Sequence, residues 1–182
     1  MRTWIALLRG VNVGGRNKLP MQALVSELRA LGLCDIRTYI QSGNVVFRGP
    51  GKPATLGRAI GAAIAVKFGF TPQVVVLSEQ DLAAAAAGNP FPEASADREG
   101  RLVHLFFLSA TPRALDRQRL ETARAPRERW EVRGRLLYLH APDGVGESKL
   151  ARQVEAILGV TATARNWRTV CALLDLARTG SG

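Results

Sequence analysis

The first half of the chain alternates between strand-like and helix-like patterns of hydrophobic and polar residues. Residues 3–9 form a mostly apolar run, which is typical of a buried strand. From Pro20 to Gly32 apolar residues recur at helical spacing, and the glycine stands where a helix would end. Residues 35–41 alternate in polarity, and Ser-Gly-Asn at 42–44 predicts a hairpin into a further strand over 45–48.

A second helix is predicted from Pro53, because apolar residues follow it at four-residue spacing: Leu56, Ile60, Ile64 and Phe68. The run at 72–78 supplies another strand, so the element order of the first half is β-α-β-β-α-β. This order predicts the ferredoxin-like plan, an antiparallel sheet with both helices on one face. The other face of the sheet is then expected to be open and to need a partner or a ligand.

The second half repeats this order. Strands are predicted over 101–109 and 160–164, and a hairpin over 129–140 is expected to turn near Gly134. One helix is predicted to begin at Thr111-Pro112. Two more are predicted from apolar faces made by Leu150, Val154, Ile157 and Leu158, and by Val170, Leu173, Leu174 and Leu176. The predicted fold class is therefore α+β, with two tandem ferredoxin-like units and an extra C-terminal helix.

A linker is predicted over residues 89–100, which hold two prolines, three acids and few large apolar groups. Ser78 and Asp81 predict a capping box for a short helix just before this stretch. We therefore expect a basic first unit over 1–88 and a second unit, with the last helix, over 101–182. The two units share no obvious residue identity, and a cleft between them is the natural place for a ligand.

Composition bounds the classes of protein that fit the chain. Its 182 residues, 47% of them hydrophobic, are enough for one large domain or two small ones. No apolar run is long enough to cross a membrane or to form a signal-peptide core, which predicts a cytoplasmic protein without a membrane partner. Cys34 and Cys171 are far apart and His104 and His140 are isolated, so we expect no disulfide framework, no metal and no cofactor.

Positive charge is concentrated in the first half of the chain. The net charge is +10, and residues 1–78 hold ten Lys or Arg against two acids, a net +8. Such a field attracts polyanions and phosphorylated ligands without specifying which one binds. The alternative is that a composition biased towards Arg leaves these residues as a solvated surface.

The stretch RGVNVGGRNKLP, residues 9–20, carries the first signal for anion binding. Glycines let a backbone turn its N–H groups towards an anion, and basic or amide side chains complete such a site. The candidate residues here are Arg9, Asn12, Gly14, Gly15, Arg16 and Lys18. Because the pattern is neither a Walker A sequence nor GxGxxG, the alternative is a wide turn with solvated basic residues.

A second candidate stretch is TYIQSGNVVF, residues 38–47. Tyr39 and Gln41 share one face of the predicted strand, where they could meet a ligand, and Ser42 and Asn44 frame the turn. The alternative is that the turn residues satisfy only the backbone of the turn itself.

Two further candidates lie at predicted helix starts in the second half. Ser148 and Lys149 follow a glycine-rich loop, where the N-terminus of a helix favours an anion, although Ser148 could equally be a helix cap. Arg165, Asn166 and Trp167 precede the last helix. Either Arg165 and Asn166 face a ligand, or Asn166 caps the helix and Trp167 anchors it in the core.

Local signatures of catalysis are absent from the sequence. It shows no closely spaced pair of carboxylates, no GxSxG, no supported Ser-His-Asp order, and no histidine near either cysteine. Whether the protein is an enzyme therefore stays open.

Taken together and in this order, the stretches ALLRGVNVGGRNKLPM, TYIQSGNVVF, NPFP, YLHAPDGVGESKL and TARNWRTV resemble the bacterial domain-of-unknown-function family numbered sixteen-ninety-seven. The resemblance runs from about Trp4 to about Leu176. It implies a small cytoplasmic-type α+β protein with ferredoxin-like elements and no established activity. The matching motif positions are Arg9, Asn12, Gly14, Gly15, Lys18, Gln41, Ser42, Gly43, Asn44, Ser148, Lys149, Arg165, Asn166 and Trp167.

The function predicted from these features is binding of a phosphorylated ligand, with a nucleic acid as the leading candidate. It rests on the basic first half, the glycine loops and an open sheet of the kind on which RNA-binding modules stack bases. One alternative is a small-molecule enzyme or nucleotide-dependent transferase with its site between the units. Another is a protein interaction module that uses a sheet edge or the last helix. The oligomeric state is left open.

Overall fold

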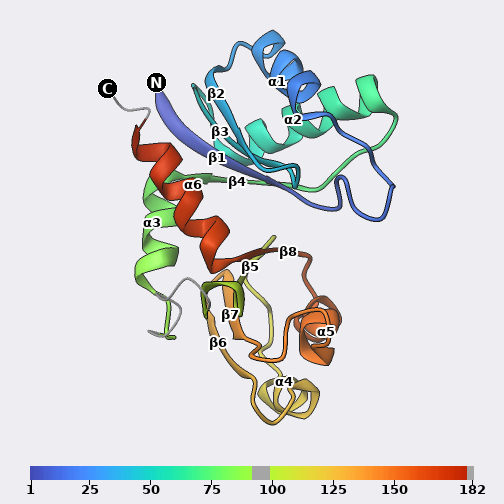
Figure 1. Ribbon diagram of the computed structural model, residues 1–182, viewed down its shortest axis with the longest axis vertical. Coiled ribbons are helices and arrows are strands. Elements are labelled where there is room, and N and C mark those ends of the chain that lie inside the picture. The colour runs from blue at the N-terminus through green and yellow to red at the C-terminus, as the bar shows by residue number, and fades with distance from the viewer. Residues whose placement is uncertain (92–98, 180–182) are drawn as a thin grey trace. The chain divides into compact units, whose positions relative to one another are not determined.

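The protein folds into two compact units, seen in a computed structural model that describes residues 1–91 and 99–179 (Figure 1). One unit consists of Met1–Ala86 together with the segment that begins at Cys171, and the other is Ala87–Val170. Across the described residues the structure is α+β, with six α-helices and two four-stranded antiparallel sheets. None of these helices combines the length and the apolar character that crossing a bilayer requires.

The first unit is built on a sheet with the strand order β2-β3-β1-β4. Helices α1 and α2 cover one face of this sheet (Figure 1). The elements are β1 (Arg2–Leu8), α1 (Met21–Ala30), β2 (Cys34–Tyr39), β3 (Asn44–Gly49), α2 (Pro53–Phe68), β4 (Val74–Ser78) and α3 (Glu79–Ala87). The predicted order of elements is thus confirmed for this unit.

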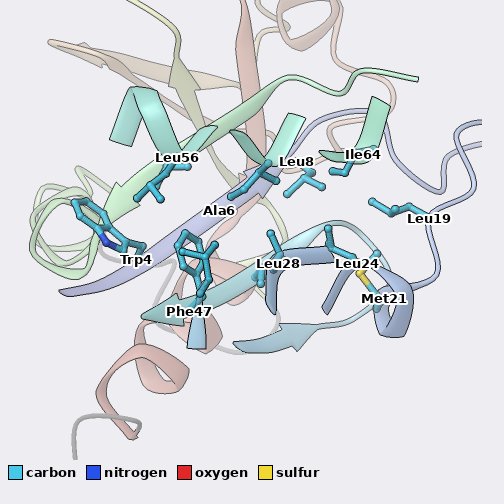
Figure 2. Packing of buried hydrophobic residues seen from close by; sticks show 14 of the residues in the cluster. Trp4, Ala6, Leu8, Leu19, Met21, Leu24, Leu28, Phe47, Leu56 and Ile64 are labelled. Atoms are coloured by element: carbon cyan, nitrogen blue, oxygen red, sulfur yellow. The ribbon is translucent and has the colours of Figure 1, made fainter. Parts of the chain in front are cut away.

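Apolar spacing positions both helices on the sheet. In α1, Met21, Leu24 and Leu28 are buried, as the helical spacing predicts. In α2, proline occupies the first turn, and Gly69 ends the helix in the left-handed region at φ 76°. Figure 2 shows the resulting core, where side chains from both helices meet Trp4, Ala6, Leu8 and Phe47 of the sheet.

The opposite face of this sheet is also buried, so the expected open face is wrong. Ile5 and Leu7 are 0% exposed and Val46 is 1% exposed, although side chains alternate along a strand and these three point away from α1 and α2. Arg37 pairs in register with Val46, and its Nη1 donates a hydrogen bond of 3.1 Å to Oγ1 of Thr179. The part of β1 from Trp4 to Leu8 contains no polar residue, which is typical of a sheet covered on both faces.

The second unit repeats the strand order of the first. Its sheet has the order β6-β7-β5-β8, and α4 and α5 pack on one face. The elements are β5 (Val103–Leu108), α4 (Arg117–Ala123), β6 (Arg129–Arg133), β7 (Leu136–His140), α5 (Lys149–Leu158), β8 (Ala162–Asn166) and α6 (Trp167–Thr179), with a 3₁₀ turn (Glu99–Arg101) before β5. The observed sheets are consistent with two tandem units.

One predicted helix start is wrong. The helix after β5 begins at Arg117 and not at Thr111-Pro112, because the Asp116 side chain accepts a hydrogen bond of 2.9 Å from the backbone N–H of Arg119. An aspartate in this position satisfies an N–H group that the first turn leaves unpaired. The predicted hairpin turn is confirmed, since Gly134 has φ 56° between β6 and β7. The strand face that the sequence analysis gives to both Tyr39 and Gln41 is wrong, because β2 ends at Tyr39 and Gln41 lies in the turn that follows.

The boundary region is described only in part. Ser78 and Asp81 form the predicted capping box, since Asp81 N–H donates to Ser78 Oγ at 3.1 Å and Ser78 N–H donates to Asp81 Oδ2 at 3.2 Å. Residues 92–98 of the predicted linker lie outside the described residues. The structure groups α6 from Cys171 onward with the first unit, whereas the sequence analysis assigns the whole helix to the second.

Candidate functional site

The glycine-rich loop between β1 and α1 is a small β-hairpin. The backbone N–H of Arg16 donates to the carbonyl of Val13 at 3.0 Å, around Gly14 at φ 57° and Gly15 at φ 76°. Two central residues with positive φ make the tight hairpin turn that glycine favours. A Cβ at either glycine would meet nothing within 4 Å, so the turn projects from the fold.

Asn12 clamps this loop to the turn between β2 and β3. Its Nδ2 donates to the carbonyl of Leu19 at 2.9 Å and to that of Gln41 at 2.8 Å, while its Oδ1 accepts from Leu19 N–H at 2.7 Å. Asn17 adds a bond of 2.9 Å from its Nδ2 to the carbonyl of Gly10. The Asn12 amide thereby holds the loop and is not available to a ligand.

Apolar contacts fix the same junction. Val11 and Leu19 are buried at 2% and 0% exposure, and Figure 2 shows Leu19 reaching the core from the loop. The carbonyl of Gly43 accepts from Leu8 N–H at 2.8 Å. A Cβ at Gly43 would lie 2.5 Å from Val11 Cγ2, and the residue has φ +71°, so only glycine lets the turn approach this closely.

The hairpin turn satisfies its own polar groups, as the alternative for this stretch predicts. Asn44 is fully buried, and its Nδ2 donates to Ser42 Oγ at 2.8 Å and to the carbonyl of Tyr39 at 3.3 Å. Tyr39 is half-buried and pairs in register with Asn44. Ser42 and Asn44 are therefore structural residues of the turn.

The side chains of Arg16, Lys18 and Gln41, all sequence-predicted site residues, are exposed at this end of the unit. Arg9 is also exposed, and its Nη1 donates to Gln73 Oε1 at 3.3 Å. We call this region, residues 9–20 with residues 40–43, the loop end. It is the place where two candidate stretches that are far apart in the sequence come together.

A hollow of about 310 Å³ lies beside the loop end, between α1 and β2. Its lining consists of Met21, Gln22, Val25, Ser26, Arg29, Thr38 and Gln41. Of these, the sequence analysis singled out only Gln41 as a site residue. A polar stripe at helical spacing on α1, made by Gln22, Ser26 and Arg29, is the signal that could have found the rest.

Charge around the hollow is positive. The two acids among residues 1–78 are both in ion pairs, with Lys67 Nζ 4.0 Å from Glu27 and Arg48 Nη1 3.4 Å from Asp35. Arg29 is the charged residue among the seven that line the hollow. Exposed ion pairs contribute little to stability. The cations of residues 1–78 outnumber the acids, and this excess creates a positive field that attracts anions.

The motif residues of the second unit act mainly as helix caps. Ser148 is buried, and its Oγ accepts from Ala151 N–H at 2.9 Å at the start of α5. Asn166 Oδ1 accepts from Thr169 N–H at 2.9 Å at the start of α6. Both residues follow the capping alternative.

The charged and aromatic members of these motifs differ in exposure. Lys149 is exposed, whereas Trp167 is half-buried. Burial lowers the pKa of Arg165 to about 10, and its Nη1 donates to the carbonyl of Ala164 at 2.8 Å. Lys149 is thus the motif side chain of this unit that is most available to solvent.

Titratable groups give no sign of a metal centre. Within residues 1–91 and 99–179, no three His, Cys, Asp or Glu side chains cluster in a way that could hold a metal ion. Burial lowers the pKa of His104 to about 4, so this imidazole is neutral at pH 7. Cys34 and Cys171 are free thiols, and burial raises the pKa of Cys171.

Comparison with known proteins identifies a family and a fold. The family described as "Protein of unknown function (DUF1697)" matches residues 1–138, which include the loop end and the hollow but not Ser148 or Arg165. A solved structure of a conserved bacterial protein from Streptococcus pneumoniae is similar over 97% of this chain and 98% of its own, with a TM-score of 0.69 and 24% identity. This likeness concerns the fold alone. No curated protein matches the chain.

Proposed function

The chain belongs to the DUF1697 family, and we propose that it binds a phosphate-bearing ligand at the loop end of its first unit. The observation that carries this proposal is the placement of Arg16 and Lys18. Both cations stand exposed on a loop that Asn12 clamps to a neighbouring turn, next to a hollow lined by Arg29. Exposed cations on a fixed backbone suit an anion better than cations on a mobile segment.

The fixed loop lowers the cost of binding. Ordering a flexible loop around a ligand costs conformational entropy, and a backbone that is already held avoids that cost. Here the amide of Asn12, the buried side chain of Leu19 and the glycine at 43 hold the backbone without a ligand. The cationic side chains then contribute the attraction, and the net +8 of residues 1–78 reinforces it.

A phosphate group can come from a small metabolite or from a nucleic acid. The buried second face of the first sheet gives no support to base stacking on that sheet, and Phe47 lies in the helix-covered core. Nucleic-acid binding would therefore rest on phosphate contacts from the loop end, which carry no sequence information. The alternatives of an enzyme site between the units or an interaction module stay predictions.

We also infer that both units have the ferredoxin-like fold. The element order β-α-β-β-α-β and the order of strands within each antiparallel sheet support this assignment. Helix α3 follows β4, and helix α6 follows β8, in addition to these elements.

The proposal is tested by measuring affinity for phosphate in both forms. Inorganic pyrophosphate is titrated by calorimetry, and labelled single-stranded RNA, single-stranded DNA and duplex DNA by fluorescence anisotropy, at about 50 and about 200 mM salt. Replacing Arg16 and Lys18 by alanine is expected to weaken pyrophosphate binding about tenfold or more, since two cations are lost.

The matched control replaces Lys52 and Arg58 by alanine, which removes the same charge from exposed positions at the start of α2 and within it. The control is expected to leave pyrophosphate affinity within about twofold. Equal losses in the two variants would contradict the proposal, because they would assign binding to overall charge. Absence of binding to every phosphate compound at low salt would also contradict it.

A further inference from the structure

The hollow beside the loop end indicates the class of ligand, an inference that rests on the function proposed above. Helix α1 runs away from the loop, so Gln22 lies near the loop and Arg29 lies seven residues further along. Seven residues of α-helix span about 10 Å. The hollow therefore extends along α1 from its start, which directly follows the cationic loop, to the guanidinium of Arg29.

The lining between these ends is uncharged, with apolar surface from Met21 and Val25 and polar side chains beside it. Gln22 and Gln41 offer amides, which donate and accept hydrogen bonds, and Ser26 and Thr38 offer hydroxyls. Ser26 Oγ donates weakly to the carbonyl of Gln22 at 3.3 Å, which leaves its lone pairs to accept from a ligand. Such groups match hydroxyls, which also donate and accept.

Several other ligand classes fit this lining poorly. Every lining residue is described, and the set contains no aromatic ring on which a nucleobase could stack and no carboxylate that could hold a cation. The volume of about 310 Å³ is at the lower end of the range for small-molecule pockets. A short, hydroxyl-rich molecule fits better than a nucleotide or a polymer.

We propose that the hollow binds a small polyhydroxy compound with an anionic group at each end, of the sugar bisphosphate class. One phosphate lies at Arg16 and Lys18 of the loop end, the hydroxyls lie against the amides and hydroxyls of the groove, and the second phosphate lies at Arg29. Arg29 determines the preference for a doubly phosphorylated ligand, because a guanidinium pairs with phosphate through two parallel hydrogen bonds.

The test compares fructose bisphosphate, fructose monophosphate, adenosine monophosphate and pyrophosphate by calorimetry. The bisphosphate is expected to bind about tenfold or more tightly than either monophosphate, since it engages both cationic ends. Arg29→Ala is expected to reduce bisphosphate affinity to that of the monophosphate, a larger loss than it causes for pyrophosphate. Ser26→Trp, at an exposed position of α1, fills the groove and is expected to weaken the bisphosphate about tenfold or more while sparing pyrophosphate.

Arg58→Ala, an exposed arginine of α2, is the matched control and is expected to leave all affinities within about twofold. Two results would overturn the groove assignment: equal affinity for bisphosphate and monophosphate, or full bisphosphate binding by Ser26→Trp. Pyrophosphate binding in the same experiments would still support the phosphate site at the loop end. If the unmodified protein does not bind pyrophosphate, both the loop-end site and the groove assignment are overturned. Circular dichroism of each variant shows that a lost affinity does not come from unfolding.

Discussion

The loop end of the first unit and the motif-bearing end of the second unit use similar residues for different purposes. In the first unit, Asn12 joins two loops and leaves the neighbouring cations exposed. In the second unit, Ser148 and Asn166 cap helices. The same kind of polar motif therefore marks a clamp between loops in one unit and ordinary helix starts in the other.

The two ends also occupy different places in equivalent sheets. Leu8, at the C-terminal end of β1, pairs with Val74 beside the loop end. In the second unit the loop before Ser148 follows His140, and Asn166 is the last residue of β8; these two residues pair with Val103 and His104 at the N-terminal end of β5. Repeated topology thus does not imply a repeated site, and this is why the proposed ligand is assigned to the first unit alone.

A substitution at Gly43 should destabilise the junction between the loop and the turn. Gly43→Ala places a Cβ against Val11 and imposes φ +71° on alanine, which is expected to lower the free energy of unfolding by about 3 kcal/mol. Gly14→Ala is the control, because it shares the positive φ but has open space around it, and about 1 kcal/mol is expected. Urea unfolding at pH 7 measures both, and equal losses would show that steric contact at Gly43 is unimportant.

The stability of the second unit is expected to depend on pH through His104. Its folded pKa is about 4 against an ordinary 6.5, so the unfolded state takes up the proton first as pH falls. Stability from the neutral imidazole is complete above about pH 6.5 and is lost progressively towards pH 4, by about 3 kcal/mol in total. Unfolding of the second unit, followed by the fluorescence of Trp130 in a variant with phenylalanine at the other two tryptophans, is expected to become easier between pH 7 and pH 5. In His104→Leu this dependence should shrink, and an unchanged dependence would assign it to other groups.

Asn12→Ala tests whether the clamp between the two loops also serves ligand binding. It removes three hydrogen bonds to backbone groups, and a loss of about 2 kcal/mol is expected together with weaker pyrophosphate binding, because the cations lose their fixed backbone. Urea unfolding and calorimetry measure the two effects. An unchanged pyrophosphate affinity would show that the clamp does not serve the proposed site.

The smallest effects are expected at the caps of the second unit. Ser148→Ala and Asn166→Ala each remove one cap, at a cost of about 1 kcal/mol in the free energy of unfolding. Pyrophosphate affinity should not change in either variant. A loss of affinity of tenfold or more in one of them would move the proposed site towards the second unit.

Periodic patterns made the elements of both units predictable. The spacing of apolar residues specified α2 and α5, and Gly134 specified a hairpin, because these signals are local. The start of α4 was missed because two capping signals compete within six residues, at Thr111-Pro112 and at Asp116. The buried second face of the first sheet was missed because the order β-α-β-β-α-β supplies helices for one face only, although Trp4–Leu8 contains no polar residue.

The candidate site was predictable only in outline. The sequence analysis named the stretches around Arg16 and Gln41, which lie together at the loop end, but the role of Asn12 depends on a carbonyl 29 residues away, which no local pattern reveals. The hollow depends on how α1 lies beside β2, so Thr38 and Arg29 gained their place from the packing of two elements. Side chains that reach backbone groups across loops are the features that a linear pattern conveys least.

Heteronuclear NMR shows residue by residue whether a phosphate group binds at the loop end. Amide shifts are followed while inorganic pyrophosphate is added to the isotope-labelled protein. We predict concentration-dependent shifts at residues 13–18 and at Gln41, which disappear when Arg16 and Lys18 are replaced by alanine. Shifts confined to residues 144–149, or none at any concentration, would contradict phosphate binding at the loop end.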